Sequence, residues 1–115
     1  MTTPYHSMLS DLMRVRGITA CLLVDEHDGV IVDSTLQFGM RGNVVAALIA
    51  SLFRRARRSL AAAGLGDADV VQLEAERGRV CAVGRDGLVL IAVAEPRVNA
   101  GLMRVELLKS RERLT

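Results

Sequence analysis

Apolar residues recur along this chain with two periods, one typical of helices and the other typical of strands. Segment 43–63 has no proline and no internal glycine, and alanine and leucine dominate it, which favours a long helix. Segment 69–76 alternates apolar and polar side chains, as expected for a strand with one wet face. Segment 88–94 is apolar throughout, so we expect a strand covered on both faces, in the middle of a sheet.

Turn and cap signals between the apolar runs define the remaining elements. Thr3 and Pro4 can start a short first helix, which Gly17 ends. Asp-Gly pairs at 28–29 and 86–87 are typical of tight hairpin turns. The predicted order is α-β-β-α-β-β-β-α, with strands at 18–25, 30–34, 69–76, 79–84 and 88–94, a long helix capped by Asn43 and a last helix that is capped by Asn99 and runs to Glu112.

These elements predict one domain over residues 1–115 with an α/β fold, more closely α+β. Two strand connections are tight turns, which join antiparallel neighbours, so the five-stranded sheet is expected to be mostly antiparallel. Helices above and below the sheet give three layers. Strand 69–76 has a polar face and follows the long helix, so we place it at an edge, where it must be covered or paired.

The two faces of the long helix have different expected roles. One face carries the i, i+3, i+4, i+7 stripe of a helix that lies on its own core. We expect this core face to consist of Val45, Leu48, Ile49, Leu52, Phe53, Ala56 and Leu60. The opposite face of the first half is small and apolar instead of charged, so a second helix could approach it closely. That face carries Ala46, Ala47 and Ala50, with Val44 and Ser51 at its margins.

A second copy of the chain would explain both the small-residue helix face and the unpaired edge. If the edge strand pairs with its copy, the two long helices come together as well. We therefore expect a homodimer whose interface combines the helix face with alternate positions of the strand. The expected interface residues are Val44, Ala46, Ala47, Ala50, Ser51, Arg54, Val70, Gln72 and Glu74.

Composition limits the class of protein. Hydrophobic residues make up 50% of the chain and aromatic residues only 3%, so the core must be built from Val, Leu, Ile and Ala. The net charge of +2 is well short of what a nucleic-acid-binding domain usually carries, and we expect no nucleic-acid partner. Cys21 and Cys81 lie in apolar runs without a CxxC pair, as buried thiols in a reducing compartment do.

The sequence also predicts where the protein resides. Its first residues, MTTPYHSML, lack the basic start and the long apolar run of a signal peptide. The longest apolar stretch, 87–94, is far too short to cross a bilayer. We therefore expect a cytoplasmic protein that does not insert into membranes.

No constellation of residues indicates catalysis, a cofactor or a metal. The only histidines are His6, near the N-terminus, and His27, in a hairpin turn. We do not expect them to meet, which gives weak support to a nucleophilic site. The acidic cluster 25–28 lacks the glutamate that a calcium loop needs at position twelve, where this chain has Leu36. Segment 39–42 precedes a helix but lacks the GK[ST] ending of a phosphate loop. We expect a protein that is not an enzyme.

Four arginines in the second half of the long helix are the main charge feature. Arg54, Arg55, Arg57 and Arg58 fan over more than half of the helix circumference. They form either a solvated face or a docking surface for an acidic partner, and arginine suits bidentate contacts with carboxylates. Arg55, Arg57 and Arg58 are the candidate partner-binding residues. Nucleic acid is a third alternative, but no aromatic residues lie between the basic ones.

Several motifs occur together in an order found in a known family. They are Val15-Arg16-Gly17-Ile18 leading into Ala20–Asp25, the hairpin segment Asp28–Val32, the alanine-rich long helix, and Asn99–Leu107 (NAGLMRVEL) after the apolar strand. By these motifs the chain resembles the roadblock/dynein light chain domain, in its prokaryotic small form. The resemblance covers nearly the whole chain.

The resemblance implies a profilin-like fold and a homodimer whose long helices pack antiparallel and whose edge strands join into one sheet. It also implies a small Ras-like GTPase as partner, whose nucleotide cycle such dimers regulate. The alternative is a scaffold or adaptor subunit of a larger signalling or motor complex without direct GTPase contact. A small-ligand sensor is a third hypothesis, but the expected Val/Leu/Ala core offers it no inward polar group.

Overall fold

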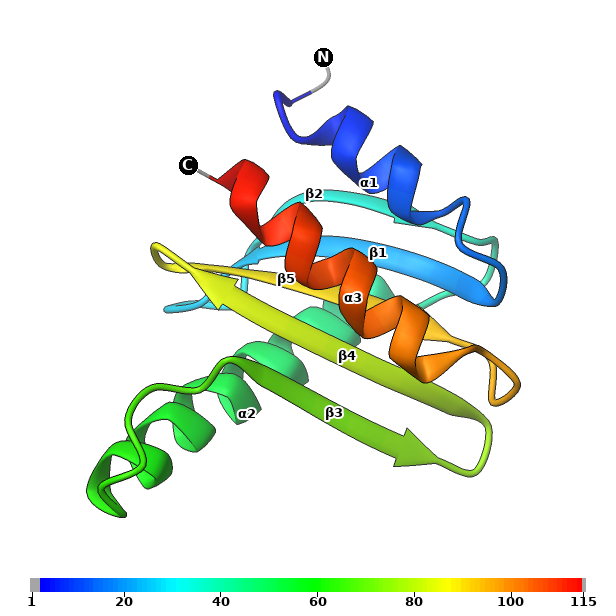
Figure 1. The fold of residues 1–115 in the computed structure, drawn as a ribbon. Helices are drawn as coiled ribbons and strands as arrows, with labels where there is room; N and C mark the ends of the chain where they lie inside the picture. Colours follow the sequence, from blue (N-terminus) through cyan, green and yellow to red (C-terminus); the bar gives the residue numbers. More distant parts are fainter. Residues whose placement is uncertain (1–2, 115) are drawn as a thin grey trace.

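A computed structural model describes residues 3–114 of the chain (Figure 1). The element order is the predicted one, with a short 3-10 turn added at the end. The elements are α1 (His6–Leu12), β1 (Ile18–Asp25), β2 (Ile31–Leu36), α2 (Gly42–Ala62), β3 (Val70–Ala75), β4 (Gly78–Arg85), β5 (Leu88–Ala94), α3 (Ala100–Arg111) and η1 (Glu112–Leu114). β1 and β5 have the bounds that the sequence predicted. No helix within the described residues is long and apolar enough to cross a membrane.

The five strands form one antiparallel sheet in the order β2-β1-β5-β4-β3. β5 is the central strand and β3 lies at an edge, as predicted, and β2 forms the other edge. α1 and α3 cover one face of the sheet, and α2 crosses the opposite face, which gives three layers (Figure 1). The predicted fold class is therefore confirmed.

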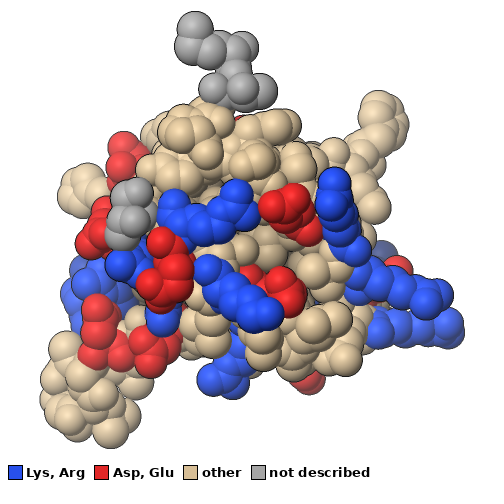
Figure 2. Space-filling model, turned by 45° about the horizontal axis from the view of Figure 1, so that its top comes forward, with Lys and Arg blue, Asp and Glu red and all other residues tan. Residues whose placement is uncertain are grey.

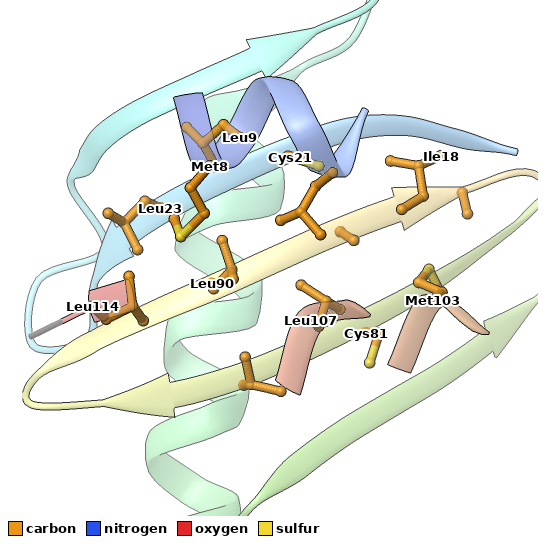
Figure 3. Packing of buried hydrophobic residues seen from close by; sticks show 14 residues of the cluster. Met8, Leu9, Ile18, Cys21, Leu23, Cys81, Leu90, Met103, Leu107 and Leu114 are labelled. Atoms are coloured by element: carbon orange, nitrogen blue, oxygen red, sulfur yellow. The ribbon is translucent and has the colours of Figure 1, made fainter. Parts of the chain in front are cut away.

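The core consists of two hydrophobic clusters, one on each face of the sheet. β5 supplies both in alternation, with Leu90 in the cluster under α1 and α3 and Ile91 in the cluster under α2. Figure 3 shows the first cluster, where Met8 of α1 and Leu107 of α3 lie over the strands. The continuous apolar run of β5 follows from this position, because neither of its faces meets water.

The turn between β4 and β5 confirms the hairpin predicted from its Asp-Gly pair. Asp86 has φ 52° and Gly87 has φ 80°. Two successive residues with positive φ form the turn whose twist matches that of the flanking strands. Asp86 is the only residue other than glycine with a positive φ among the described residues, which agrees with the tolerance of aspartate for this conformation.

Only one of the three predicted helix caps is present. The Asn99 side chain accepts a hydrogen bond from the Leu102 N–H at 3.0 Å, as predicted for α3. The prediction of Asn43 as cap was wrong, because α2 begins at Gly42 and no side chain caps it. A Cβ on Gly42 would lie 2.8 Å from Leu36 Cδ1, so the first turn of α2 starts where the chain passes directly against β2. Thr3 does not cap α1, which begins two residues later than predicted and has no side-chain cap.

Candidate interaction surface

α2 is rotated about its axis relative to the prediction, so a different set of its residues faces the sheet. Ala46 and Ala50 are 0% exposed within the single chain and pack in the cluster under α2, whereas Leu48 is 63% exposed. The prediction of Ala46 and Ala50 as outward residues, and of Leu48 as a core residue, was therefore wrong. A Cβ on Gly29 would lie 3.3 Å from Ala47 Cα. The small side chains thus let α2 approach its own β1–β2 hairpin.

The side of α2 that faces away from the sheet is nevertheless apolar in its first half. Val44 is 41% exposed, Ala47 and Leu48 are exposed, and Ser51 is half-buried. We call these four residues the α2 outer face. A contiguous exposed apolar surface on a helix is a candidate interface with another protein. Val44, Ala47 and Ser51 also belong to the predicted interface, and their role in a dimer stays a prediction.

β3 adds exposed apolar area on the same side of the sheet. α2 packs mainly against β1, β2 and β5. Val71 of β3 packs against the cluster under α2, and the rest of the edge strand is open on this side. Leu73 of β3 pairs with Val80, which belongs to the cluster under α2, so both side chains point to the α2 side. Leu73 is 39% exposed. A partner seated on the α2 outer face would therefore find further apolar surface along β3.

The main chain of β3 is also open. Ala75 and Gly78 flank a two-residue turn and form the closing pair of the β3–β4 ladder. Because the direction of main-chain groups alternates along an antiparallel strand, those of Val70, Gln72 and Glu74 point away from β4. Within residues 3–114 no side chain donates to or accepts from the main chain at these three positions. These are the strand positions that the sequence assigned to a dimer interface, and that role stays a prediction.

Two of the four α2 arginines contact the rest of their own chain. Arg54 Nη1 donates to the main-chain carbonyls of Glu26 and His27, the latter at 3.0 Å. Arg57 Nη1 donates to both carboxylate oxygens of Glu26 at 2.7 Å, and its Nε donates to Asp67 Oδ1 at 2.8 Å. These hydrogen bonds, first with Glu26 and then with Asp67, raise the pKa of Arg57. The same contact with Arg57 lowers the pKa of Asp67.

Arg54 and Arg57 therefore hold α2 against the β1–β2 turn and the α2–β3 loop, a structural role that the sequence did not predict for them. Glu26 lies in the β1–β2 turn and Asp67 in the α2–β3 loop, and no sequence spacing links them to Arg57. Arg55 and Arg58 are exposed and form no ion pair within residues 3–114. Arg58 also lines an open cleft of about 460 Å³, together with Glu26, Arg54, Arg57, Ala61, Gly66 and Asp67.

The other candidates from the sequence have structural roles in this fold. Asp25 Oδ1 accepts from the His27 N–H at 2.8 Å and Asp28 Oδ1 accepts from the Val30 N–H at 3.0 Å, which are turn contacts. Among residues 3–114 no group of three or more His, Cys, Asp or Glu could hold a metal ion. Burial raises the pKa of the Cys21 thiol to about 12 and that of Cys81 to about 11. Both thiols are therefore protonated at neutral pH, unlike a nucleophilic cysteine.

Charge on the opposite side of the molecule is mixed. Figure 2 shows basic and acidic side chains next to one another on the side that α1 and α3 cover. Ion pairs on this side include Arg113 with Asp11 at 3.2 Å and Arg85 with Glu112 at 2.8 Å. Unlike these arginines, Arg55 and Arg58 form no ion pair within the described residues.

Comparison of the sequence with known proteins gives distant relatives. No family model matches the chain. An uncharacterized protein of Methanocaldococcus jannaschii, MJ1340, is 26% identical over 107 residues, which cover 93% of this chain and 93% of the relative.

Comparison with solved structures identifies the fold. A roadblock/LC7 domain from Streptomyces avermitilis has a TM-score of 0.84 at 20% identity, over 94% of this chain and 92% of the other. A structure of MglB with a tetrameric arrangement has a TM-score of 0.87 at 17% identity, over 99% of this chain and 89% of the other. The resemblance found in the motifs is confirmed at the level of the fold. The chain has the fold of roadblock/LC7 domains.

Proposed function

We propose that the chain is a non-enzymatic regulatory module that forms a homodimer and binds a small Ras-like GTPase. The observation that supports the dimer is the coexistence of the apolar α2 outer face and the open β3 edge. A two-fold axis beside β3 would pair the two β3 strands and bring the two α2 helices together. Such a contact uses one surface patch on both copies, as in most homodimers.

Other findings agree with self-association and with a regulatory partner. MglB, a protein of this fold, has been observed in a tetrameric arrangement. The motifs resemble a family whose dimers regulate small GTPases. The basic residues Arg55 and Arg58 lie on the helix that would be at the centre of the dimer, where they are available to carboxylates of a partner.

The proposed mechanism is a shift of the GTPase between its nucleotide-dependent conformations. The dimer would offer its two α2 helices and the adjacent sheet surface to the switch region of the GTPase. If it binds one switch conformation more tightly, it favours that conformation by the difference in binding free energy. A tenfold preference corresponds to about 1.4 kcal/mol.

The size of the protein in solution tests the dimer. Leu48→Glu places a charge in the proposed seam on both copies, and an unpaired buried charge costs about 3 kcal/mol or more. We expect light scattering coupled to size exclusion to give a dimer for the wild type and a folded monomer for Leu48→Glu. Leu65→Glu, at an exposed loop position, is the matched control and should stay dimeric. A wild-type monomer, or a Leu48→Glu dimer, contradicts the proposal.

Binding to a GTPase is tested separately. A small Ras-like GTPase from the same genome is loaded with GDP or with a non-hydrolysable GTP analogue, and calorimetry measures its affinity for the dimer. We expect measurable binding with a clear preference for one nucleotide state. Failure of every small GTPase of that genome to bind, together with a pull-down that recovers only structural subunits, would favour the scaffold alternative.

A further inference from the structure

We infer that Asp33 selects the edge of the sheet that self-associates, by closing the β2 edge against other strands. The inference rests on the proposed homodimer through β3. The sheet has two edges, β2 and β3, of six residues each. Unpaired edge strands recruit further strands. A chain that paired through both edges would form an open polymer, so a dimer needs one edge to be closed.

The direction of the β2 main chain follows from its last contact with β1. The Gln37 N–H donates to the Thr19 carbonyl at 3.2 Å, so residue 37 points toward β1. Main-chain groups alternate along an antiparallel strand. Those of Thr35 and Asp33 therefore also point toward β1, while those of Ser34 and Leu36 point outward, where a new strand would bind.

The outward N–H of Ser34 is already occupied by the side chain of its neighbour. It donates to Asp33 Oδ1 at 2.8 Å. The second carboxylate oxygen, Oδ2, accepts a hydrogen bond from Thr3 Oγ1 and lies 3.6 Å from His6 Nδ1. Thr3 and His6 of α1 thus hold the Asp33 carboxylate at the edge of the sheet. There it accepts the hydrogen bond of the Ser34 N–H, which an incoming strand would need as a donor.

A bulge interrupts the same edge strand. Leu23 of β1 pairs with Asp33, and the next residue, Val24, pairs with Ile31, so the register skips Val32. Bulges and inward-facing charges are both known protections of edge strands. Val32 and Leu36 are exposed apolar side chains, so an unprotected β2 would have apolar surface to bury against another strand.

β3 has neither of these protections. Its ladder with β4 runs without a register shift from Val70 to Ala75. Within the described part of the chain no side chain occupies the outward N–H groups of Gln72 or Glu74. The two edges therefore differ in a way that favours pairing through β3 and prevents it through β2.

Removing the carboxylate tests the inference. Asp33→Ala frees the Ser34 N–H, and we expect it to form species of at least twice the wild-type mass, increasing with concentration, in light scattering. Asp33→Asn keeps an oxygen that can accept from Ser34, and it should keep the wild-type mass. A folded Asp33→Ala variant of wild-type mass would overturn the inference.

A proline distinguishes strand pairing from aggregation of unfolded chains. Ser34→Pro has no N–H to offer an incoming strand, and proline is tolerated on edge strands. We expect the double variant Asp33→Ala/Ser34→Pro to return to the wild-type mass. If the double variant remains associated, pairing through β2 is not the route and the inference fails.

Two further measurements separate this inference from the proposed function and from loss of folding. Gln72→Pro removes an outward N–H group of β3, so we expect this variant to be a monomer. A dimer of unchanged mass would contradict the proposed β3 interface and would not bear on the closure of β2. Hydrogen exchange in the wild type needs no variant. The Ser34 amide should exchange more slowly than the outward-pointing Leu36 amide, and equal rates would show that Asp33 does not hold it.

Discussion

At the residue scale, neighbouring arginines of α2 have different roles because of what lies within their reach. Arg54 and Arg57 contact the β1–β2 turn, and Arg57 also binds Asp67 of the α2–β3 loop. Arg55 and Arg58 are exposed and form no ion pair within the described residues, although Arg58 lines the same cleft as Glu26 and Asp67. The same residue type thus stabilises the fold at two positions and is available to a partner at the other two.

This division predicts different costs for two alanine substitutions. Arg57→Ala loses the hydrogen bonds from Nη1 to the Glu26 carboxylate and from Nε to Asp67, and we expect the free energy of unfolding to fall by about 1 kcal/mol, at the upper end for partly exposed pairs. Arg58→Ala should change it by less than about 0.5 kcal/mol. Urea unfolding of both variants at low and high salt measures the difference. Equal losses would show that the Arg57 contacts contribute nothing to stability.

Asp33 gives the stability of the protein a pH dependence of known sign. The hydrogen bond from Thr3, with smaller effects of the Ser34 N–H and His6, lowers the pKa of Asp33 below its ordinary value of 3.8. A lowered pKa stabilises the fold above the unfolded-state value, and this contribution is lost as the pH falls through the folded-state value. We therefore expect the stability difference between wild type and Asp33→Asn to be largest at neutral pH and to shrink below pH 3.8. Urea unfolding at a series of pH values measures it, and a constant difference would contradict the assignment.

At the element scale, the orientation of α2 is set by how closely it approaches the strands beneath it. A Cβ on Gly84 would lie 2.6 Å from Phe53 Cε1, so the glycine in β4 makes room for the one aromatic ring under this helix. Gly29 and the small residues of α2 make a second close contact at the β1–β2 turn. These two contacts fix the rotation of the helix and leave Leu48 outside.

The rotation predicts that two alanines three residues apart on α2, Ala47 and Ala50, respond differently to glutamate. Ala50→Glu buries an unpaired charge, which costs about 3–5 kcal/mol, a large part of the stability of a small domain. Ala47→Glu lies on the exposed α2 outer face, so the chain should lose the dimer and remain a folded monomer, with its thermal midpoint lowered only by the loss of association. Circular dichroism and light scattering report the two effects separately. A well-folded Ala50→Glu variant would contradict the burial of Ala50.

At the scale of the whole molecule, the two faces of the sheet differ in chemistry. One face has α1 and α3, with charges of both signs next to one another (Figure 2). The other has α2, with the α2 outer face in its first half and the exposed arginines in its second half. A regulatory dimer would use the second face for both of its contacts. Self-association would use the apolar first half of α2, and partner binding would use the basic second half.

This arrangement predicts a salt-dependent contact with an acidic partner. The double variant Arg55→Ala/Arg58→Ala should weaken binding to the GTPase about tenfold, or about 1.4 kcal/mol, and reduce its dependence on salt, without changing the mass of the dimer. Arg16→Ala/Arg97→Ala removes the same charge from exposed positions outside α2 and serves as control. Equal effects of the two variants would show that only net charge matters.

The local pattern of the sequence determined the elements, their order and the sheet edge formed by β3. An all-apolar run such as 88–94, a pair such as Asp86-Gly87 and a cap such as Asn99 act through neighbours in the chain, so each could be recognised without the fold. The tertiary structure alone decided which side of α2 faces the sheet, the internal contacts of Arg54 and Arg57, and the closure of β2 by Asp33. Alanine allows a helix to approach either a strand or another helix, so the sequence does not decide which side of α2 faces the sheet. A charged side chain pairs with a distant residue only when the fold brings the two segments together. Both results depend on distances in space, which the spacing of residues along the chain does not encode.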